Sequence, residues 1–220
     1  MKIRAIITGA TGMVGEGVLH ECLAHPEVEA VLVITRRPCG VQHPKLKEVL
    51  HQDFSDFSGL EKELTGYNAG YLCMGVSSIG MTEETYTRLT YDLTMALART
   101  LAKLNPDMTL CYVSGLGTDS SEQGRVMWGR VKGRTENELM RLPVRKAYMF
   151  RPAFIQPTKG LKNTYTVYRM LAPLFPVLKF LFPNYMVTLR EIGLAMVNSV
   201  NKGPDKRVLE VKDIVKLARN

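Results

Sequence analysis

A glycine-rich turn near the N-terminus is the first group of residues whose spacing could support chemistry. The segment Thr8-Gly9-Ala10-Thr11-Gly12-Met13-Val14-Gly15 follows an apolar run and precedes a stretch with helical spacing. Gly9 would permit the tight turn, Gly12 would let the backbone approach a pyrophosphate, and Gly15 would let helix and strand pack closely. The free N–H groups of the helix N-terminus would bind the phosphates. We therefore predict a dinucleotide-binding turn made by Gly9, Thr11, Gly12, Met13, Val14 and Gly15.

The end of the second predicted strand indicates which dinucleotide would bind. Proteins that bind NAD usually place an acidic residue there, about 20 residues after the glycine turn, for the ribose hydroxyls. Here Thr35 is followed by Arg36 and Arg37, and Glu29 lies at the opposite end of the strand. Two arginines suit the 2′-phosphate of NADP, so NADP is favoured over NAD. A pair of solvated arginines without a ligand is the alternative.

These residues need a parallel sheet to position them, and the sequence predicts one. Apolar runs that read as strands span 2–8, 30–35, 47–51, 69–74, 108–113 and 147–150. Helical spacing separates them at 13–24, 57–64, 82–104 and 126–140. Buried strands that alternate with helices are typical of an α/β protein whose parallel sheet is covered on both faces. Right-handed crossovers then predict a doubly wound sheet, the Rossmann fold.

The chain changes character after Arg151, where prolines break it into short segments. One more helix is predicted over 191–200, a late strand over 207–211 and a last helical turn over 213–219. We interpret residues 1–220 as a single domain in which 152–220 form a small substrate or lid lobe. The apolar segment 170–182 could pack that lobe, cover a substrate or touch a membrane surface.

On these residues the chain resembles the extended or atypical branch of the short-chain dehydrogenase/reductase superfamily. That branch contains NmrA-like and nucleoside-diphosphate-sugar epimerase-like proteins. The similarity covers about residues 1–155, and TGATGMVG resembles the TGxxGxxG of the superfamily. Asp53-Phe54 resembles the pair that holds the adenine, and Cys73-Met74-Gly75 the strand end that passes under the cofactor. Tyr112-Val113-Ser114 resembles the strand end with the catalytic serine, and Arg151-Pro152 the one beside the nicotinamide. The resemblance implies further cofactor-binding roles for Asp53, Phe54, Met74, Gly75, Val76, Lys132, Arg151, Pro152 and Ala153.

The chain departs from the superfamily at the acid/base residue. In the superfamily, Tyr-x-x-x-Lys follows the serine; the tyrosine moves the proton, while the lysine lowers its pKa and holds the ribose. Here the segment reads Trp128-Gly129-Arg130-Val131-Lys132. An indole N–H can only donate a hydrogen bond, so it cannot shuttle a proton near neutral pH. The resemblance still implies catalytic roles for Ser114 and Lys132.

Three interpretations of Trp128 stay open, besides simple packing. The chemistry could use another group, namely Ser114, Lys132, Tyr86 or Tyr91. The substrate of an oxidoreductase or epimerase-like enzyme could need little proton transfer. Alternatively, the protein could bind NADP without turnover, as a regulatory protein of the NmrA-like type.

The basic residues are concentrated in the second half. Of the net charge of +8, residues 1–113 contribute −3 and residues 114–220 contribute +11. Part of the excess lies at Arg125, Arg130, Lys132, Arg134, Arg141, Arg145, Lys146 and Arg151. This cluster favours a small anionic substrate or a solvated basic face. No basic motif interleaved with aromatic residues supports specific nucleic-acid binding.

Composition excludes several other classes of protein. The 220 residues are 45% hydrophobic and 23% charged, values of an ordinary globular chain rather than a disordered one. No apolar run approaches the roughly 18 residues of a transmembrane helix, and the N-terminus does not resemble a signal peptide. Four separated cysteines without a CxxC motif argue against disulfides, and no metal site is expected. We expect a cytoplasmic protein, and the sequence gives no prediction for the substrate or the oligomeric state.

Overall fold

The computed structural model describes residues 1–158, 160–163 and 175–220. The central sheet contains β1 (Ile3–Thr8), β2 (Val28–Thr35), β3 (Leu46–Leu50), β4 (Ala69–Leu72), β5 (Thr109–Val113), β6 (Lys146–Arg151) and β9 (Val208–Glu210). The helices of the described residues are α1 (Met13–Ala24), α2 (Glu61–Leu64), α3 (Glu83–Thr87), α4 (Leu93–Leu104), α5 (Met127–Arg141), α7 (Phe175–Leu181), α8 (Leu189–Lys202) and α9 (Val211–Ala218). None of them is long and apolar enough to cross a bilayer.

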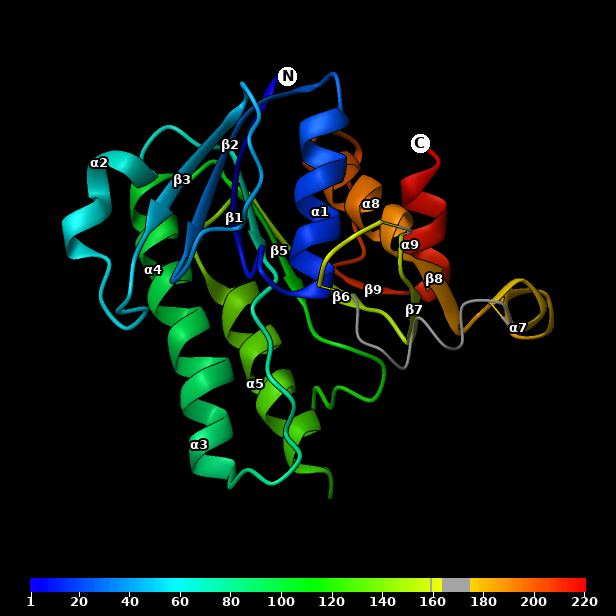
Figure 1. The fold of residues 1–220 in the computed structure, drawn as a ribbon. Helices are drawn as coiled ribbons and strands as arrows, with labels where there is room; N and C mark the ends of the chain where they lie inside the picture. The colour runs from blue at the N-terminus through cyan, green and yellow to red at the C-terminus, as the bar shows by residue number, and fades with distance from the viewer. Residues whose placement is uncertain (159, 164–174) are drawn as a thin grey trace.

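The seven strands of the central sheet are all parallel, in the order β3-β2-β1-β4-β5-β6-β9. Figure 1 shows α1, α8 and α9 on one face of this sheet and α3, α4 and α5 on the other. The doubly wound parallel sheet predicted from the sequence is therefore confirmed. The chain reverses direction across the sheet at β1, which pairs with both β2 and β4. Loops diverge at such a switch point and leave a crevice at the carboxyl ends of the strands.

Both faces of the sheet are buried, which explains the unbroken apolar runs of the strands. Ile7 and Val33 belong to the core between the sheet and the helices α1, α8 and α9, whereas Ile6 and Leu32 belong to the core on the opposite face. Because successive side chains of a strand point to opposite faces, the inner strands have apolar residues at nearly every position, whereas the edge strand β3 leaves Lys47 and Leu50 exposed.

The long helix predicted over 82–104 is present with one irregularity. Thr82 caps it, since its hydroxyl accepts a hydrogen bond from the Thr85 N–H at 3.2 Å. Between α3 and α4, the residues Arg88–Asp92 form one turn of π-helix. Such turns are frequent near functional sites, and this one buries Thr90 and Tyr91.

The C-terminal part of the chain is built into the main body. β9 pairs with β6 at the edge of the sheet, and α8 packs on both α1 and α9. A capping box between Thr188 and Glu191 begins α8. The sequence analysis did not predict β7 (Phe154–Gln156) and β8 (Met186–Thr188), which form a separate two-stranded sheet. Residues 170–174 of the predicted apolar segment lie outside the described residues.

Candidate functional site

The glycine turn joins β1 to α1, and its three glycines have different surroundings. Gly9 has φ +73°, and a Cβ there would lie 2.5 Å from the carbonyl oxygen of Cys73. A Cβ at Gly15 would lie 2.1 Å from the carbonyl oxygen of Gly9. The fold itself therefore requires glycine at these two positions. Gly12 is exposed and extended, with φ −107° and ψ 165°, and a Cβ there would meet only the Gly9 oxygen at 3.4 Å.

The N-terminus of α1 has no side-chain cap. Gly12 is the N-cap residue, and it has no side chain that could accept from the first N–H groups of the helix. The N–H groups of the first turn have no partner within a helix, so they need a ligand, water or a cap. Met13 and Val14 of this turn line the adjoining cavity. An exposed glycine before an uncapped helix fits a bound phosphate.

Beside the turn lies a hollow of about 420 Å³, which we call the nucleotide end of the groove. Arg36 and Arg37 line it together with Gly9, Thr11 and Phe54, and no carboxylate lines it among the described residues. Both arginines are exposed, and within the described chain neither guanidinium has a hydrogen bond or ion pair. The Arg36 carbonyl is fixed by the Gln52 side-chain amide, which donates to it at 2.7 Å. This end can therefore receive an anionic group.

A second hollow of about 370 Å³ extends the nucleotide end toward Asp53 and Phe54. The Asp53 carboxylate accepts hydrogen bonds from the Ser55 hydroxyl at 2.5 Å and the Ser55 N–H at 2.9 Å. These bonds lower the pKa of Asp53 and fix its position. Phe54 is buried, with its ring centroid 5.6 Å from that of Phe57. An aromatic floor and a fixed carboxylate are arranged as a base-binding pocket would need.

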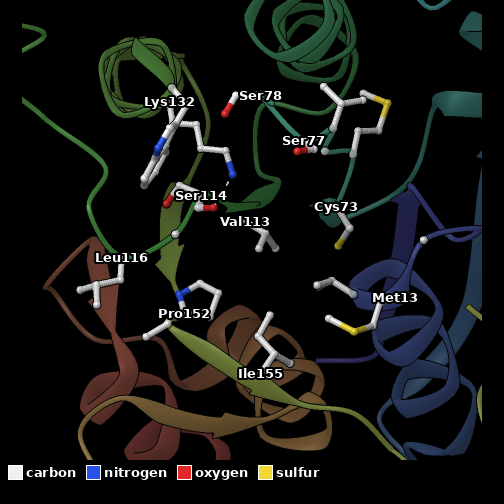
Figure 2. Close-up of a pocket in the computed structure, with 18 of the residues that line it drawn as sticks. Met13, Cys73, Ser77, Ser78, Val113, Ser114, Leu116, Lys132, Pro152 and Ile155 are labelled. Atoms are coloured by element: carbon white, nitrogen blue, oxygen red, sulfur yellow. Dashed lines mark hydrogen bonds between the residues drawn. The ribbon is translucent and has the colours of Figure 1, made fainter. Parts of the chain in front are cut away.

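The opposite end of the groove is a cavity of about 660 Å³, which we call the reacting end (Figure 2). Its walls come from the start of α1, the loops after β4 and β5, the helix α5 and the residues that follow β6. It shares Gly12, Cys73, Met74, Gly75 and Val76 with the second hollow. The hollows therefore adjoin along one groove at the carboxyl ends of the strands.

Lys132 is the charged side chain of the reacting end. It extends from α5, and its Nζ donates a hydrogen bond to the Ser114 carbonyl oxygen at 2.5 Å (Figure 2). Burial lowers the pKa of Lys132 to about 8, although the nearby negative charge of Glu136 acts in the opposite direction. An amine with this pKa can be either protonated or neutral near neutral pH, as a proton donor or acceptor requires.

Ser114 lies on the cavity wall, but its hydroxyl points into the protein. It donates to Glu136 Oε1 at 2.5 Å, and the Phe150 carbonyl oxygen lies 3.1 Å away. Glu136 has no solvent exposure and forms an ion pair with Arg151, whose Nε donates to Oε1 at 3.0 Å. Arg151 also donates to the Ser120 hydroxyl at 2.6 Å. A buried charged network therefore lies directly behind the cavity wall.

Two of the three aromatic residues considered from the sequence line the cavity with Lys132. Trp128 lines the cavity and packs against the loop after β5, where a Cβ at Gly117 would lie 3.0 Å from the indole ring. Tyr86 also lines the cavity but is almost fully buried, which raises the pKa of its hydroxyl. Tyr91 does not line the cavity, and the Arg134 guanidinium stacks 4.3 Å from its ring centroid.

The structure brings most of the predicted site residues to this groove. Those that line it are Gly9, Thr11, Gly12, Met13, Val14, Arg36, Arg37, Asp53, Phe54, Met74, Gly75, Val76, Ser114, Lys132, Pro152 and Ala153. Gly15 and Arg151 do not line it. Gly15 packs beneath the turn, and the Arg151 guanidinium is held by Glu136.

The basic cluster of the sequence is dispersed in the structure, and only Lys132 reaches the cavity. Arg130 pairs with Glu83 at 2.6 Å, and Lys146 pairs with Asp205 at 3.3 Å. Sequence reasoning missed Glu136 as a member of the site. Its position one helical turn after Lys132 was the available signal, because residues four apart share a helix face. The described residues contain no group of His, Cys, Asp and Glu side chains that could hold a metal ion.

The model of the NAD dependent epimerase/dehydratase family matches residues 5–123 of the chain. A similar curated protein is "Protein fmp52-1, mitochondrial" of Aspergillus terreus, 26% identical over 162 residues, which cover 70% of this chain and 67% of that protein. "Protein FMP52, mitochondrial" of Chaetomium globosum is 23% identical over 227 residues, which cover 97% of this chain and 96% of that protein.

Solved structures share the fold at low sequence identity. A short chain dehydrogenase of Burkholderia cenocepacia in complex with NADP has a TM-score of 0.64 and 13% identity, over 98% of this chain and 92% of that one. The enzyme WbmG of Bordetella bronchiseptica in complex with NAD has a TM-score of 0.69 and 13% identity, over 99% of this chain and 77% of that one. One of these proteins is in complex with NADP and the other with NAD, and at this identity the likeness shows the shared fold.

The curated relatives correct one expectation. We expected a cytoplasmic protein because the N-terminus does not resemble a secretory signal, but these relatives are named mitochondrial proteins. The expectation is therefore wrong. An N-terminus unlike a secretory signal carries no information on import into an organelle.

Proposed function

Because the chain belongs to the NAD dependent epimerase/dehydratase family, we propose that it is an oxidoreductase that prefers NADP and interconverts a carbonyl compound with its alcohol. One observation carries the proposal. Among the described residues, the 420 Å³ hollow at the nucleotide end is lined by two arginines without protein partners and by no carboxylate, and the reacting end is lined by one lysine. That distribution of charge matches a phosphorylated dinucleotide at one end and a proton-transfer site at the other.

The preference for NADP rests on Arg36 and Arg37. A carboxylate that accepted from the ribose hydroxyls would favour NAD, and would repel a 2′-phosphate. Among the described residues the hollow beside these arginines has no such group. Two guanidinium groups can form charge-assisted hydrogen bonds with a phosphate, which are about twice as strong as neutral ones.

The remaining residues of the groove would hold the dinucleotide along its length. Gly12 and the uncapped turn of α1 would bind the pyrophosphate, and Asp53 with Phe54 would hold the adenine. Lys132 and the backbone around Pro152 and Ala153 would border the nicotinamide part of the cavity. When bound, the cofactor supplies or accepts a hydride.

Lys132 would hold the proton of the reaction. Its Nζ is fixed by the Ser114 carbonyl oxygen, and its pKa near 8 permits both protonation states. In the reductive direction Nζ gives a proton to the oxygen of the substrate, and in the oxidative direction it takes that proton back. Ser114 would act mainly through its backbone, because Glu136 engages its hydroxyl.

A second function is favoured by a separate observation, namely the state of Ser114 and position 128. The Ser114 hydroxyl is bound to a buried carboxylate. The indole of Trp128, which lines the cavity, can donate a hydrogen bond but cannot accept a proton. A protein that binds NADP as a signal and does not turn it over would be compatible with both. Turnover of any carbonyl compound that depends on Lys132 would separate the two functions.

The cofactor proposal is tested by calorimetric titration of the wild type and the double variant Arg36→Ala/Arg37→Ala with NADPH and NADH. We expect the wild type to bind NADPH more tightly, and the double variant to lose most of that advantage while its NADH affinity changes little. Equal weakening of both cofactors, or a wild type that binds NADH more tightly, would reject the assignment.

A further inference from the structure

Large apolar side chains are exposed around the mouth of the reacting end. We call Val76, Ile79, Leu116 and Phe154 the apolar rim, since all four line the cavity. The exposed fraction is 90% for Ile79, 59% for Phe154 and 46% for Leu116. Exposed apolar groups that gather at a cavity mouth mark a surface that a ligand covers.

The rim is assembled from separate parts of the chain. Val76 and Ile79 belong to the loop after β4, Leu116 to the loop after β5, and Phe154 to β7. The Leu116 N–H donates to the Pro152 carbonyl oxygen at 2.8 Å, which fixes this loop beside the residues that follow β6. The Phe154 N–H donates to the Tyr185 carbonyl oxygen at 2.9 Å, which fixes β7. Ordered backbone therefore presents at least these two rim side chains.

Charge is nearly absent from the same cavity. Among its described lining residues Lys132 is the one that carries a formal charge, and its amine is already bound to Ser114. Phosphate and carboxylate groups are normally held by arginines or several donors. The nearby arginines are directed elsewhere, since Arg130 pairs with Glu83 and Arg151 with Glu136. An anionic substrate would find little to bind here.

The serine and lysine side chains of the cavity lie together toward one side, and apolar side chains line the rest of it. Figure 2 shows Ser78, Ser114 and Lys132 toward one side, and Leu116, Pro152 and Ile155 toward the other. A substrate bound between these walls would have one polar group and an apolar remainder. The cavity of about 660 Å³ has the size of a typical small-molecule site.

We propose that the reacting end takes an uncharged carbonyl compound with an apolar chain or ring, whose body the apolar rim covers and whose oxygen lies at Lys132. The identity of the reacting group rests on the proposed function. The choice of an apolar, uncharged body rests on the rim and on the missing charges. This replaces the anionic substrate that the basic cluster of the sequence favoured.

The binding test uses the one tryptophan of the chain, Trp128, which lines the cavity. The fluorescence of the NADP-loaded protein is titrated with 2-butanol, 2-hexanol, 2-octanol and 7-hydroxyoctanoate. We expect the dissociation constant to fall by about fourfold for each added methylene, as for transfer of hydrocarbon out of water. The carboxylate should bind more weakly than 2-octanol. No dependence on chain length, or tighter binding of 7-hydroxyoctanoate, would overturn the proposal.

Rim variants locate the binding to this surface. Leu116→Asn and Phe154→Asn change exposed side chains, so the fold should survive, and each should weaken 2-octanol binding by about tenfold while leaving NADPH affinity unchanged. Leu50→Asn, an exposed leucine at the end of β3 that does not line the cavity, is the matched control. Rim variants that bind 2-octanol as the control does would reject the rim. Binding of 2-octanol without reduction of 2-octanone by NADPH would support the rim and count against the proposed oxidoreductase.

Discussion

Arg37 at the end of β2 and Arg151 at the end of β6 are both arginines at the carboxyl edge of the same sheet, yet their surroundings differ. Arg37 is exposed, and its guanidinium has no hydrogen bond or ion pair in the described part of the chain. Arg151 is held by Glu136 and Ser120. The same contrast holds for the two ends of the groove. The nucleotide end leaves its donors free, whereas the reacting end binds its polar groups to one another.

This difference indicates what each end is built to do. Exposed donors at the nucleotide end are hydrated in the free protein, and they can form charge-assisted hydrogen bonds with an anionic ligand. The network of Ser114, Glu136 and Arg151 instead gains its bonds within the protein, and thereby fixes the wall that carries Lys132. Position in a basic stretch of sequence therefore does not show that an arginine is available to a ligand, since Arg151 lies in such a stretch and is bound within the protein.

The variant with the strongest effect on stability removes a carboxylate from the charged network behind the reacting end. Glu136→Ala would leave the partly buried Arg151 guanidinium without its carboxylate, so the free energy of unfolding should fall by about 3 kcal/mol. Chemical denaturation measures the change. Glu138→Ala on the same helix, which breaks the surface pair with Arg141, is the control and should cost about 1 kcal/mol or less. Equal effects of the two variants would mean that the network does not stabilise the wall.

Substitutions at the nucleotide end should have the opposite effect: they should weaken cofactor binding and leave the stability of the protein nearly unchanged. Gly12→Val places a branched side chain where the phosphates would approach, at a backbone conformation that any residue adopts. It should abolish measurable NADPH binding and change the free energy of unfolding by about 1 kcal/mol or less. Gly15→Ala should instead destabilise the fold by about 1–3 kcal/mol, because its methyl group meets the Gly9 carbonyl. Unchanged NADPH affinity in Gly12→Val would exclude the turn as the binding site.

The sequence was sufficient to predict the seven-stranded sheet and the residues that line the nucleotide end, for a physical reason. Strands buried on both faces read as apolar runs, and the residues of the nucleotide end directly follow β1, β2 and β3 in the chain. The charged network behind the reacting end depends instead on contacts between residues that are far apart in the sequence. The Ser114 hydroxyl is directed by a carboxylate 22 positions away, and Glu136 meets an arginine 15 positions away. No local sequence pattern predicts contacts between residues so far apart in the chain. The strands β7 and β8 have three residues each, too few to show an alternation.

The pH dependence of turnover sharpens the account of Lys132. Lys132 is protonated below its pKa of about 8 and neutral above it. Reduction uses this proton, so kcat/KM for a ketone should be level below about pH 8 and fall by about tenfold per pH unit above it. Oxidation of the alcohol needs the neutral amine and should show the reverse. Lys132→Arg stays protonated and should abolish the bend. A bend that persists in this variant would assign the titration to another group.

A smaller effect is expected at position 128. Trp128→Tyr introduces a hydroxyl on the same helix face as Lys132, and it should raise reductase activity severalfold with little change in NADPH affinity. Trp128→Phe provides an aromatic ring without the hydroxyl and should show no gain. If the two variants behave alike, position 128 does not contribute to proton transfer.

The role of the guanidinium groups at the nucleotide end is tested most directly with two small nucleotides, one that carries a 2′-phosphate and one that lacks it. Competition of 2′,5′-ADP (adenosine 2′,5′-bisphosphate) and 5′-AMP for the wild-type protein compares two ligands that differ in the 2′-phosphate alone. Charge-assisted bonds to Arg36 and Arg37 should make 2′,5′-ADP bind at least about tenfold more tightly, and Arg36→Ala/Arg37→Ala should abolish the difference. Equal affinity of the wild type for the two ligands would contradict the account.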